Sequence, residues 1–346
     1  MPHPAGGVET AVHAQPSRAR RAPLVAAVCA ALVLLGVAGF AFARSRGPKA
    51  PATRATTAAE APPSTRPAPA PPSAGTLAAT PSSAPTPDCD PWGCGQQRRL
   101  AAAAALVRTG PGQLGITVLD RRTGAVWTAG TAEHRMWASS TPKLAMAVSL
   151  LERARTGELT LNGTARAQID AMLAVSDNNA ADALWDRFGG ASQVPRFRER
   201  YGMTGLDFVP GFPRRWGFLK CSSADLRRLM TYVLTKLDAE DRDHVVTAMR
   251  QVGAIQRWGV RAAGPAQRPG TKNGWSVESD AGRQHWCTSS VGFAGPGERY
   301  VVAVMDDLPP GASIAAGVHA VSDVVATVFG AKVPAAVTVP DESTGR

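Results

Sequence analysis

The chain has 346 residues, of which 44% are hydrophobic, and it carries a formal net charge of +11 at pH 7. This length allows one large domain with appended segments, or two smaller domains. The basic residues are accompanied by no aromatic interleaving and no nucleic-acid-binding motif, so we expect a solvated basic surface and no nucleic acid partner.

Residues 24–43 form an apolar stretch that contains no charged residue and is long enough to cross a bilayer as a helix. We expect residues 1–23 to be a short cytoplasmic tail and the rest of the chain to lie outside the cytoplasm, as a single-pass protein of the cell membrane. A secretory signal core is usually shorter, but the Ala-x-Ala site at 41–43 leaves cleavage and secretion as the alternative. Lipidation at Cys29 is not expected, because Val28 before it is too large for that processing.

Residues 44–94 are dominated by Pro, Ala, Thr and Ser, and such a segment has too little apolar mass to form a core, so we predict a disordered linker. The cysteines at its end and beyond it are Cys89, Cys94, Cys221 and Cys287. An even number in an exported segment predicts two disulfides, for which three connectivities are possible. We favour Cys89 with Cys94 and Cys221 with Cys287. No histidine stands at ligand spacing from them, so no metal site is expected.

The folded part is expected to span residues 95–335, with residues 336–346 as a C-terminal tail. Its elements are predicted in this order: a helix over 96–108, a hairpin of strands over 114–120 and 125–130, a helix over 140–156, a mostly helical stretch over 164–252, strands over 267–274, 286–294 and 299–305, and a helix over 313–329. Strands at both ends of a helical insertion predict an α+β fold, in which an antiparallel sheet with packed helices lies beside a helical lobe.

The first motif is Ser-Thr-Pro-Lys at 140–143, where the predicted helix over 140–156 begins. At this spacing Ser140 and Lys143 lie on one helical face, close enough to exchange a proton. Ser139 is less suited to such chemistry, because its partner three residues on is Pro142. The alternative interpretation is that Ser140 caps the helix, Pro142 occupies its first turn and Lys143 is solvated.

Two further motifs follow in the chain. Ser-Asp-Asn at 176–178 begins an amphipathic helix, and residues of these three types are also common helix caps. Lys-Asn-Gly-Trp at 272–275 is predicted to end a strand, and its alternative interpretation is a polar turn. Each motif is weak by itself.

The order of the three motifs resembles the signature set of the penicillin-recognising serine enzymes. Residues 95–332 are most similar to the class A β-lactamases and their related serine hydrolases, which implies the serine β-lactamase or transpeptidase-like fold. In that fold the regions of Cys221 and Cys287 approach each other, which favours their pairing.

By this resemblance the catalytic residues are Ser140, Lys143, Ser176 and Lys272, and the substrate contacts Asn178, Asn273, Gly274 and Trp275. Ser140 is implied to be the nucleophile, and Lys143 its base, with a pKa lowered by burial and by the cation Lys272. Ser176 would pass a proton to the leaving nitrogen, and Lys272 would attract a substrate carboxylate. The backbone N–H groups of Ser140 and Trp275 would bind the oxyanion.

Three features depart from the class A pattern. Asn273 replaces the usual Thr or Ser, and the separation of Ser140 from Ser176 is shorter than is typical. The loop over 205–220 contains no glutamate, whereas class A enzymes place one there to activate the hydrolytic water. Asp207 is the only acid in this loop and hence the candidate for deacylation; the alternative is a local turn. Residues that could line the cleft, although packing or surface roles are expected for them, are Arg214, Arg215, Trp216, Arg257 and Trp258.

These observations predict a monomeric, membrane-tethered serine hydrolase outside the cytoplasm, acting on β-lactams or related acyl-amides with slow deacylation. No metal and no organic cofactor are expected. One alternative is a D,D-peptidase-like enzyme acting on the stem peptides of peptidoglycan. A second alternative is a binding or sensing module that keeps the pocket without turnover.

Overall fold

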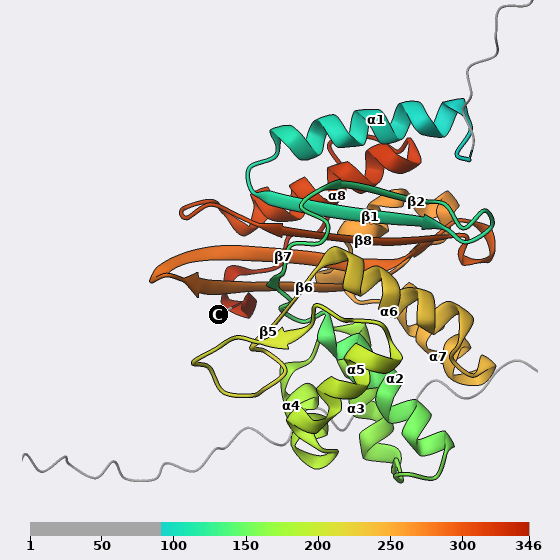
Figure 1. The fold of residues 1–346 in the computed structure, drawn as a ribbon, viewed down its shortest axis with the longest axis vertical. Helices are drawn as coiled ribbons and strands as arrows, with labels where there is room; N and C mark the ends of the chain where they lie inside the picture. The colour runs from blue at the N-terminus through green and yellow to red at the C-terminus, as the bar shows by residue number, and fades with distance from the viewer. Residues whose placement is uncertain (1–90, 346) are drawn as a thin grey trace, which may run out of the picture. The chain divides into compact units, whose positions relative to one another are not determined.

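Strands from both ends of the domain pair into one antiparallel sheet. The computed structural model describes residues 91–345 (Figure 1). The strands are β1 (Gln113–Asp120), β2 (Val126–Gly130), β6 (Gly270–Asp280), β7 (Arg283–Ala294) and β8 (Tyr300–Asp307), in the order β2-β1-β8-β7-β6. Because β1 pairs with β8 over its whole length, the first and last strands of the sheet hold the two ends of the domain together.

One face of this sheet is covered by α1 (Cys94–Thr109) and α8 (Ile314–Phe329), which lie side by side in Figure 1. Their apolar faces are buried against the strands: Leu100 on α1 and Val318 and Val325 on α8 belong to one hydrophobic cluster. Fully burying an aliphatic side chain of this size stabilises the fold by about 1.5–3 kcal/mol.

The opposite face packs against the helical lobe, whose central helix is α2 (Pro142–Arg155). Every residue of α2 from Pro142 to Glu152 is buried, so apolar residues occur on all sides of this helix. The other elements of the lobe and its border are α3 (Gly163–Ala174), α4 (Asn178–Arg187), α5 (Val194–Arg200), α6 (Ser223–Thr235), α7 (Ala239–Arg250) and the short strands β3 (Met136–Trp137), β4 (Asp207–Phe208) and β5 (Leu219–Cys221). The predicted α+β architecture with a helical lobe is therefore confirmed.

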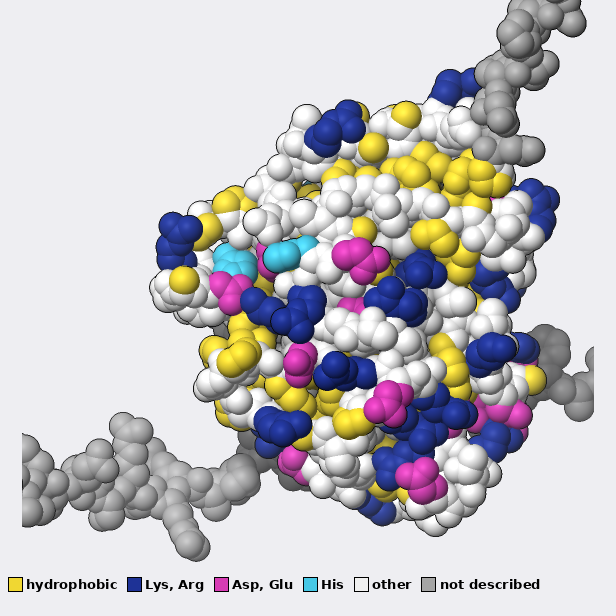
Figure 2. Space-filling view, in the orientation of Figure 1, with side chains coloured by type: hydrophobic (Ala, Val, Ile, Leu, Met, Phe, Trp, Pro, Cys, Tyr) yellow, Lys and Arg dark blue, Asp and Glu magenta, His cyan; other side chains and the backbone are white. Residues whose placement is uncertain are grey.

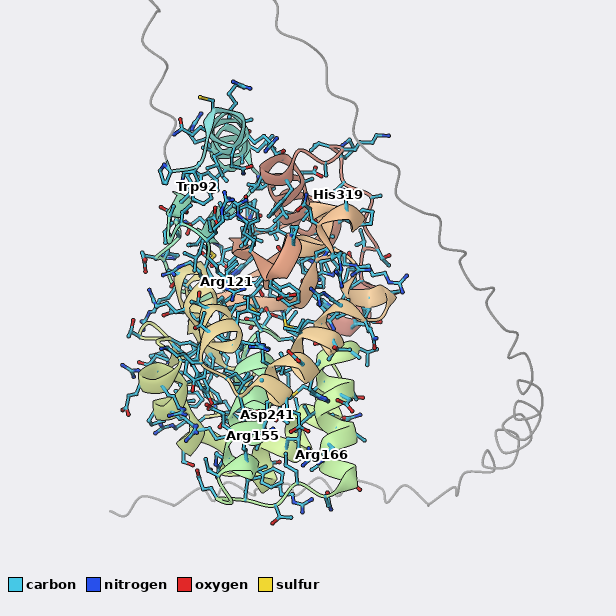
Figure 3. The ribbon with its side chains drawn as sticks, turned by 90° about the vertical axis from the view of Figure 1, so that its right-hand side faces the viewer. Trp92, Arg121, Arg155, Arg166, Asp241 and His319 are labelled. Carbon is cyan, nitrogen blue, oxygen red and sulfur yellow. The ribbon has the colours of Figure 1, made fainter. Side chains whose placement is uncertain are left out.

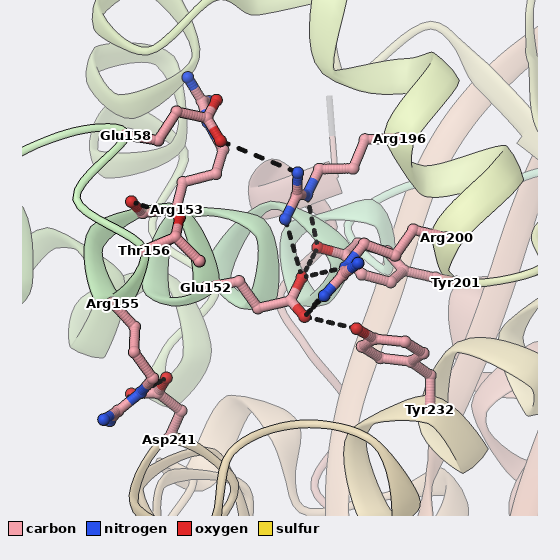
Figure 4. Close-up of polar contacts among 10 residues, drawn as sticks. All are labelled: Glu152, Arg153, Arg155, Thr156, Glu158, Arg196, Arg200, Tyr201, Tyr232 and Asp241. Carbon is pink, nitrogen blue, oxygen red and sulfur yellow. Dashed lines mark hydrogen bonds and ion pairs between the residues drawn. The ribbon is translucent and has the colours of Figure 1, made fainter.

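A buried carboxylate fastens α2 to its neighbours in the lobe (Figure 4). Glu152 accepts hydrogen bonds from Tyr201 at 2.7 Å, from Arg200 at 3.0 Å and from Arg196 at 3.3 Å, and also from Tyr232 on α6. Burial by itself would raise the pKa of Glu152, but the bonds from Arg200, Tyr232 and Tyr201 lower it below its usual value. Two arginines of the basic run at 196–200 are thus bound to this carboxylate, and are not simply solvated.

A second ion pair joins α2 to α7. Arg155 donates hydrogen bonds of 2.7 and 2.9 Å to the two carboxylate oxygens of Asp241. Figure 3 shows the two residues together at the end of the lobe, away from the sheet. Because the Arg155 side chain is 37% exposed, water screens this pair much more than it screens the Glu152 cluster.

Three boundaries differ from the prediction. Strand β6 continues to Asp280, although it was expected to end at Gly274. Helix α2 begins at Pro142 with Thr141 as its N-cap residue, so Ser140 is not the cap. The predicted tail includes a short 3₁₀ helix, Glu342–Gly345, which packs against β6.

The predicted bridge between Cys221 and Cys287 is wrong, because both are free, buried thiols. Cys221 lies in the hydrophobic core of the lobe, whereas Cys287 on β7 lies opposite Asp307, so the two side chains have different surroundings. Burial raises the pKa of both thiols well above its usual value. Cys94 is disulfide-bonded, and its predicted pairing with Cys89 concerns a residue outside the described range.

No helix within residues 91–345 is long and apolar enough to cross a membrane. The apolar stretch over 24–43, the tail before it and the linker up to residue 90 lie outside the described residues. On the face that Figure 2 shows, Lys and Arg side chains are interspersed with Asp and Glu side chains.

Candidate active site

Ser140 lies just before α2, at the wall of a cavity of about 650 Å³. Neither its Oγ nor its backbone N–H forms a hydrogen bond with any described residue, so both are available to a ligand. The N-terminus of α2 carries a partial positive charge, which favours negative charge on the Ser140 oxygen. Ser139 has a left-handed φ of 48° and shares a 2.6 Å hydrogen bond with Ser276, so its hydroxyl is already engaged.

Lys143 is fully buried behind this cavity, one helical turn from Ser140. Its Nζ donates hydrogen bonds of 2.6 Å to both the Ser176 carbonyl and Asn178 Oδ1, and one of 3.3 Å to Ser176 Oγ. Burial lowers the pKa of Lys143 to about 7, although Asp177 and Asp182 act in the opposite direction. Near neutral pH a large share of Lys143 is therefore unprotonated and can accept a proton.

Lys272 reaches the same hydroxyl from strand β6. Its Nζ donates to Ser176 Oγ at 2.9 Å, and burial, followed by the charge of Lys143, lowers the pKa of Lys272 well below its usual value. A hydroxyl has two lone pairs and one hydrogen. Because both lone pairs of Ser176 Oγ accept hydrogen bonds from lysines, its hydrogen is available to another acceptor. Asp177 is a helix cap, since its Oδ1 accepts from the Ala180 N–H at 2.8 Å.

Trp216, in the loop over 205–220, lies over Lys143. The Lys143 Nζ lies 4.4 Å from the centre of the indole ring, and the Trp216 N–H donates to Asp182 at 2.9 Å. Trp216 also lines the cavity, so it belongs to the site, whereas the sequence favoured an ordinary packing role. The loop thus covers the buried lysine with an aromatic ring.

Asp207 does not belong to this cavity. It is exposed, its Oδ1 accepts from the neighbouring Phe208 N–H at 2.8 Å, and it lines a different cavity together with Arg198 and Arg214. The prediction of Asp207 as a deacylating acid is therefore not supported by its position. The bond to Phe208 is local, which agrees with the alternative interpretation of Asp207 as part of a local turn.

Gln256 is a residue of the site that the sequence analysis missed. Its side-chain N–H group donates to the Leu173 and Ala174 carbonyls at 2.6 and 2.9 Å, and its Oε1 accepts from Lys272 at 3.1 Å and from the Asn273 N–H at 3.0 Å. It therefore links the end of α3 to the strand that carries Lys272. A single glutamine in a loop has no sequence signal that would reveal this role.

Asn273 points away from the cavity. Its side chain donates to the Gln256 and Trp258 carbonyls at 3.0 and 3.3 Å and accepts from Thr271 and Ser290 at 2.7 Å each. It is completely buried, so the expected contact with a substrate carboxylate would require breaking this network.

Gly274 allows β6 to approach the nucleophile closely. A Cβ at this position would lie 2.7 Å from the Ser140 nitrogen and 3.0 Å from the Ala138 carbonyl oxygen. Of the other residues considered, Trp258 is buried in the core, and Arg257 is exposed and lines a separate cavity.

Two unexpected parts of the chain complete the cavity wall. The C-terminal segment contributes Ser343, Thr344 and Gly345, and Trp275 Nε1 donates to Thr344 Oγ1 at 2.9 Å. Beyond the motif on β6, Glu278 lines the cavity as well. The full set of lining residues is Ser139, Ser140, Val175, Ser176, Asn178, Trp216, Gly217, Phe218, Ile255, Trp275, Ser276, Val277, Glu278, Ser343, Thr344 and Gly345.

Comparisons with known proteins found similar sequences and similar folds. A family model described as a β-lactamase enzyme family matches residues 162–329, a range that contains Ser176 and Lys272 but begins after Ser140. The chain is 29% identical over 225 residues to "Putative lipoprotein LppW" of Mycobacterium tuberculosis, covering 62% of this chain and 69% of that protein.

Solved structures share the fold. A β-lactamase from Burkholderia vietnamiensis aligns with a TM-score of 0.55 at 23% identity, covering 68% of this chain and 95% of that one. A variant of the last common ancestor of Gram-negative bacteria β-lactamase class A aligns with a TM-score of 0.55 at 20% identity, covering 67% of this chain and 97% of that one.

Proposed function

Because this chain is related to the class A β-lactamases by family model and by fold, we propose that it is a serine hydrolase whose Ser140 is acylated by β-lactams or related acyl-amides. The observation that carries the proposal is the meeting of all three motifs at one cavity. Ser140 and Ser176 line it, and Lys143 and Lys272 both donate to the Ser176 hydroxyl.

In the proposed acylation, Ser140 Oγ attacks the carbonyl carbon of the amide and its proton passes to neutral Lys143. A neutral amine keeps two hydrogens, which suit its 2.6 Å bonds to the Ser176 carbonyl and Asn178. Neutral Lys143 then gives up its third and longest hydrogen bond, to Ser176 Oγ, and its lone pair is available for the Ser140 proton. A base with a pKa near the working pH is the most effective kind.

The carbon–nitrogen bond breaks when the leaving nitrogen gains a proton. Ser176 is placed to give that proton, because the lysines face its lone pairs, and Lys143 can return to it the proton taken from Ser140. The free N–H of Ser140, together with that of Trp275, is proposed to stabilise the oxyanion formed during attack. Atoms and charges balance: one acyl–nitrogen bond is exchanged for one acyl–oxygen bond.

Deacylation is proposed to be slow. Hydrolysis of the acyl-enzyme needs a water molecule with a base beside it. The loop over 205–220 supplies the Trp216 indole at Lys143, and its single acid, Asp207, lines another cavity. This same observation favours the second candidate function, a module that binds β-lactam or peptidoglycan peptides without rapid turnover.

The test is the intact mass of the purified protein after mixing with benzylpenicillin, followed over time. A persistent adduct on Ser140 is expected, absent from Ser140→Ala and present in Ser139→Ala. A short-lived adduct would support an efficient β-lactamase. Absence of an adduct with every β-lactam tried would contradict the proposal.

We also propose that the protein is associated with the membrane outside the cytoplasm. The support is the apolar stretch over 24–43 and the name of the relative LppW, which describes a lipoprotein. Phase separation of the full chain in detergent, combined with the mass of its N-terminal peptide, tests this. An unmodified peptide containing 24–43 indicates an anchor, and a lipid adduct on the N-terminal peptide indicates lipidation. Partition of the protein into the aqueous phase, without this peptide, indicates secretion after cleavage and would contradict membrane association.

A further inference from the structure

Glu278 differs from every other residue that lines the Ser140 cavity, because it is the one charged side chain among those described there. It lies on β6 beyond Trp275, on the same face of the strand as Ser276. Lys143 and Lys272 are buried behind Ser176 and do not form this wall. A ligand in the cavity would therefore meet a single acid.

Glu278 has no ion-pair partner among the described residues. Lys220 on β5, whose charge acts to lower the pKa of Glu278, binds both oxygens of Asp280 at 2.9 Å. The other groups near Glu278 are Asp307 on β8 and Cys287 and His285 on β7, so acids predominate. Burial, and then the charges of Asp280 and Asp307, raise the pKa of Glu278 to about 7, although a hydrogen bond with Ser276 acts against this.

We propose that Glu278 is a subsite for a cationic group, such as a protonated amine, on the acyl donor. A half-buried carboxylate without a partner is stabilised by an incoming cation, and a cation there lowers the carboxylate pKa in return. This deepens the function proposed above and rests on it. It names the substrate class as acyl-amides that carry an ammonium group.

The strand geometry says where on the substrate this group belongs. Glu278 lies three positions after Trp275, which is about 10 Å along an extended strand. Trp275 contributes the proposed oxyanion contact, so the reacting carbonyl lies near the start of this distance. The cation therefore belongs at the far end of the donor's side chain, several bonds from the carbonyl.

A matched pair of penicillins tests the subsite. One carries a para-aminomethyl-phenylacetyl side chain and the other a para-ethyl-phenylacetyl side chain, which has nearly the same shape but no charge. The second-order rate constant of acylation is measured for each by intact mass. At pH 8 the wild-type protein is expected to prefer the cationic donor by about tenfold or more, and Glu278→Gln to react equally with both.

The pH dependence adds a second readout. Glu278 is mostly protonated at pH 6 and mostly ionised at pH 8, so the preference for the cationic donor should grow between these values in the wild type and stay flat in Glu278→Gln. Changes in Lys143 protonation affect both donors alike and cancel in the ratio. Glu199→Gln, which removes an exposed acid of α5 outside the cavity, should behave as the wild type.

The outcomes separate this inference from the function on which it rests. If both donors acylate Ser140 at equal rates, and the ratio of the two rate constants does not change in Glu278→Gln, the subsite is wrong and the proposed serine hydrolase function stands. If neither donor forms an adduct, the proposed function fails. Calorimetry then measures the binding of the same two compounds to Ser140→Ala. The subsite requires tighter binding of the cationic compound, and this difference must disappear when Glu278→Gln is combined with Ser140→Ala.

Discussion

Lys143 is the side chain on which the proposed chemistry depends most, because its protonation changes near neutral pH. With a pKa of about 7, its neutral fraction grows as the pH rises. We therefore expect the acylation rate constant for a penicillin with an uncharged side chain to increase about tenfold from pH 6 to pH 8. Lys143→Arg, which stays protonated, should lower the rate about 10²–10⁴-fold and remove this rise. A flat wild-type profile would mean that Lys143 is not the base.

Trp216 is expected to hold that pKa low. The indole excludes water from the Lys143 ammonium, whose Nζ is 4.4 Å from the ring centre. Trp216→Ala should admit water, raise the pKa of Lys143 and move the midpoint of the acylation profile to higher pH. Trp216→Phe keeps a ring and should move the midpoint less. An unchanged midpoint in Trp216→Ala would show that other residues keep Lys143 dry.

At the level of elements, α2 is held by two ion-pair clusters of very different exposure. Glu152→Ala should lower the free energy of unfolding by about 3–5 kcal/mol, because it leaves Arg200, Arg196 and two tyrosines without their buried partner. Arg155→Ala, at the exposed end of the same helix, should lower the free energy of unfolding much less, because water screens its ion pair with Asp241. Urea denaturation of both variants measures the contrast, and equal losses would contradict it.

The Glu152 cluster also predicts how stability depends on acid. The pKa of Glu152 is lower in the folded state than in the unfolded state. The stabilising contribution of its carboxylate is therefore complete above the unfolded-state pKa and is lost as the pH falls toward the folded-state pKa. The stability difference between the wild type and Glu152→Gln should thus shrink on acidification. Thermal unfolding between pH 7 and pH 3 measures it, and a constant difference would argue against a charge effect.

Residues that belong to local patterns within one helix or strand could be predicted from the sequence. Ser140, Lys143, Ser176 and Lys272 could be proposed from the sequence because each belongs to a short local pattern at a helix start or on a strand. Glu278 was not considered because the strand was predicted to end at Gly274, whereas that glycine makes room for the Ser140 nitrogen within a strand that continues.

Contacts between distant segments could not be predicted in this way. Gln256 and Trp216 acquire their roles only when loops fold against Lys272 and Lys143, and nothing in their own neighbourhood signals this. The Cys221–Cys287 error has a similar origin, because the resemblance placed the two regions near each other but did not show which side chains come together.

At the scale of the whole molecule, the cavity is completed by residues far apart in the chain. Ending the chain at Pro340 removes the wall formed by residues 343–345 and should speed acylation by β-lactams with bulky side chains more than by small ones. Thr344→Val keeps this wall but removes the acceptor for Trp275 Nε1 and the donor to the Asp341 carbonyl, and it should have a smaller effect. Rates for a large and a small β-lactam measure this, and an equal change for both would contradict a steric role.

The position of residues 343–345 has a practical consequence for how this protein is produced. A purification tag or fusion partner attached to the C-terminus would start next to the cavity that holds Ser140. Such an appendage would crowd or displace the segment, and a lower acylation rate would then be mistaken for a property of the protein itself. Kinetic work should therefore use an affinity handle on the N-terminal side of residue 91, or one that is removed before measurement.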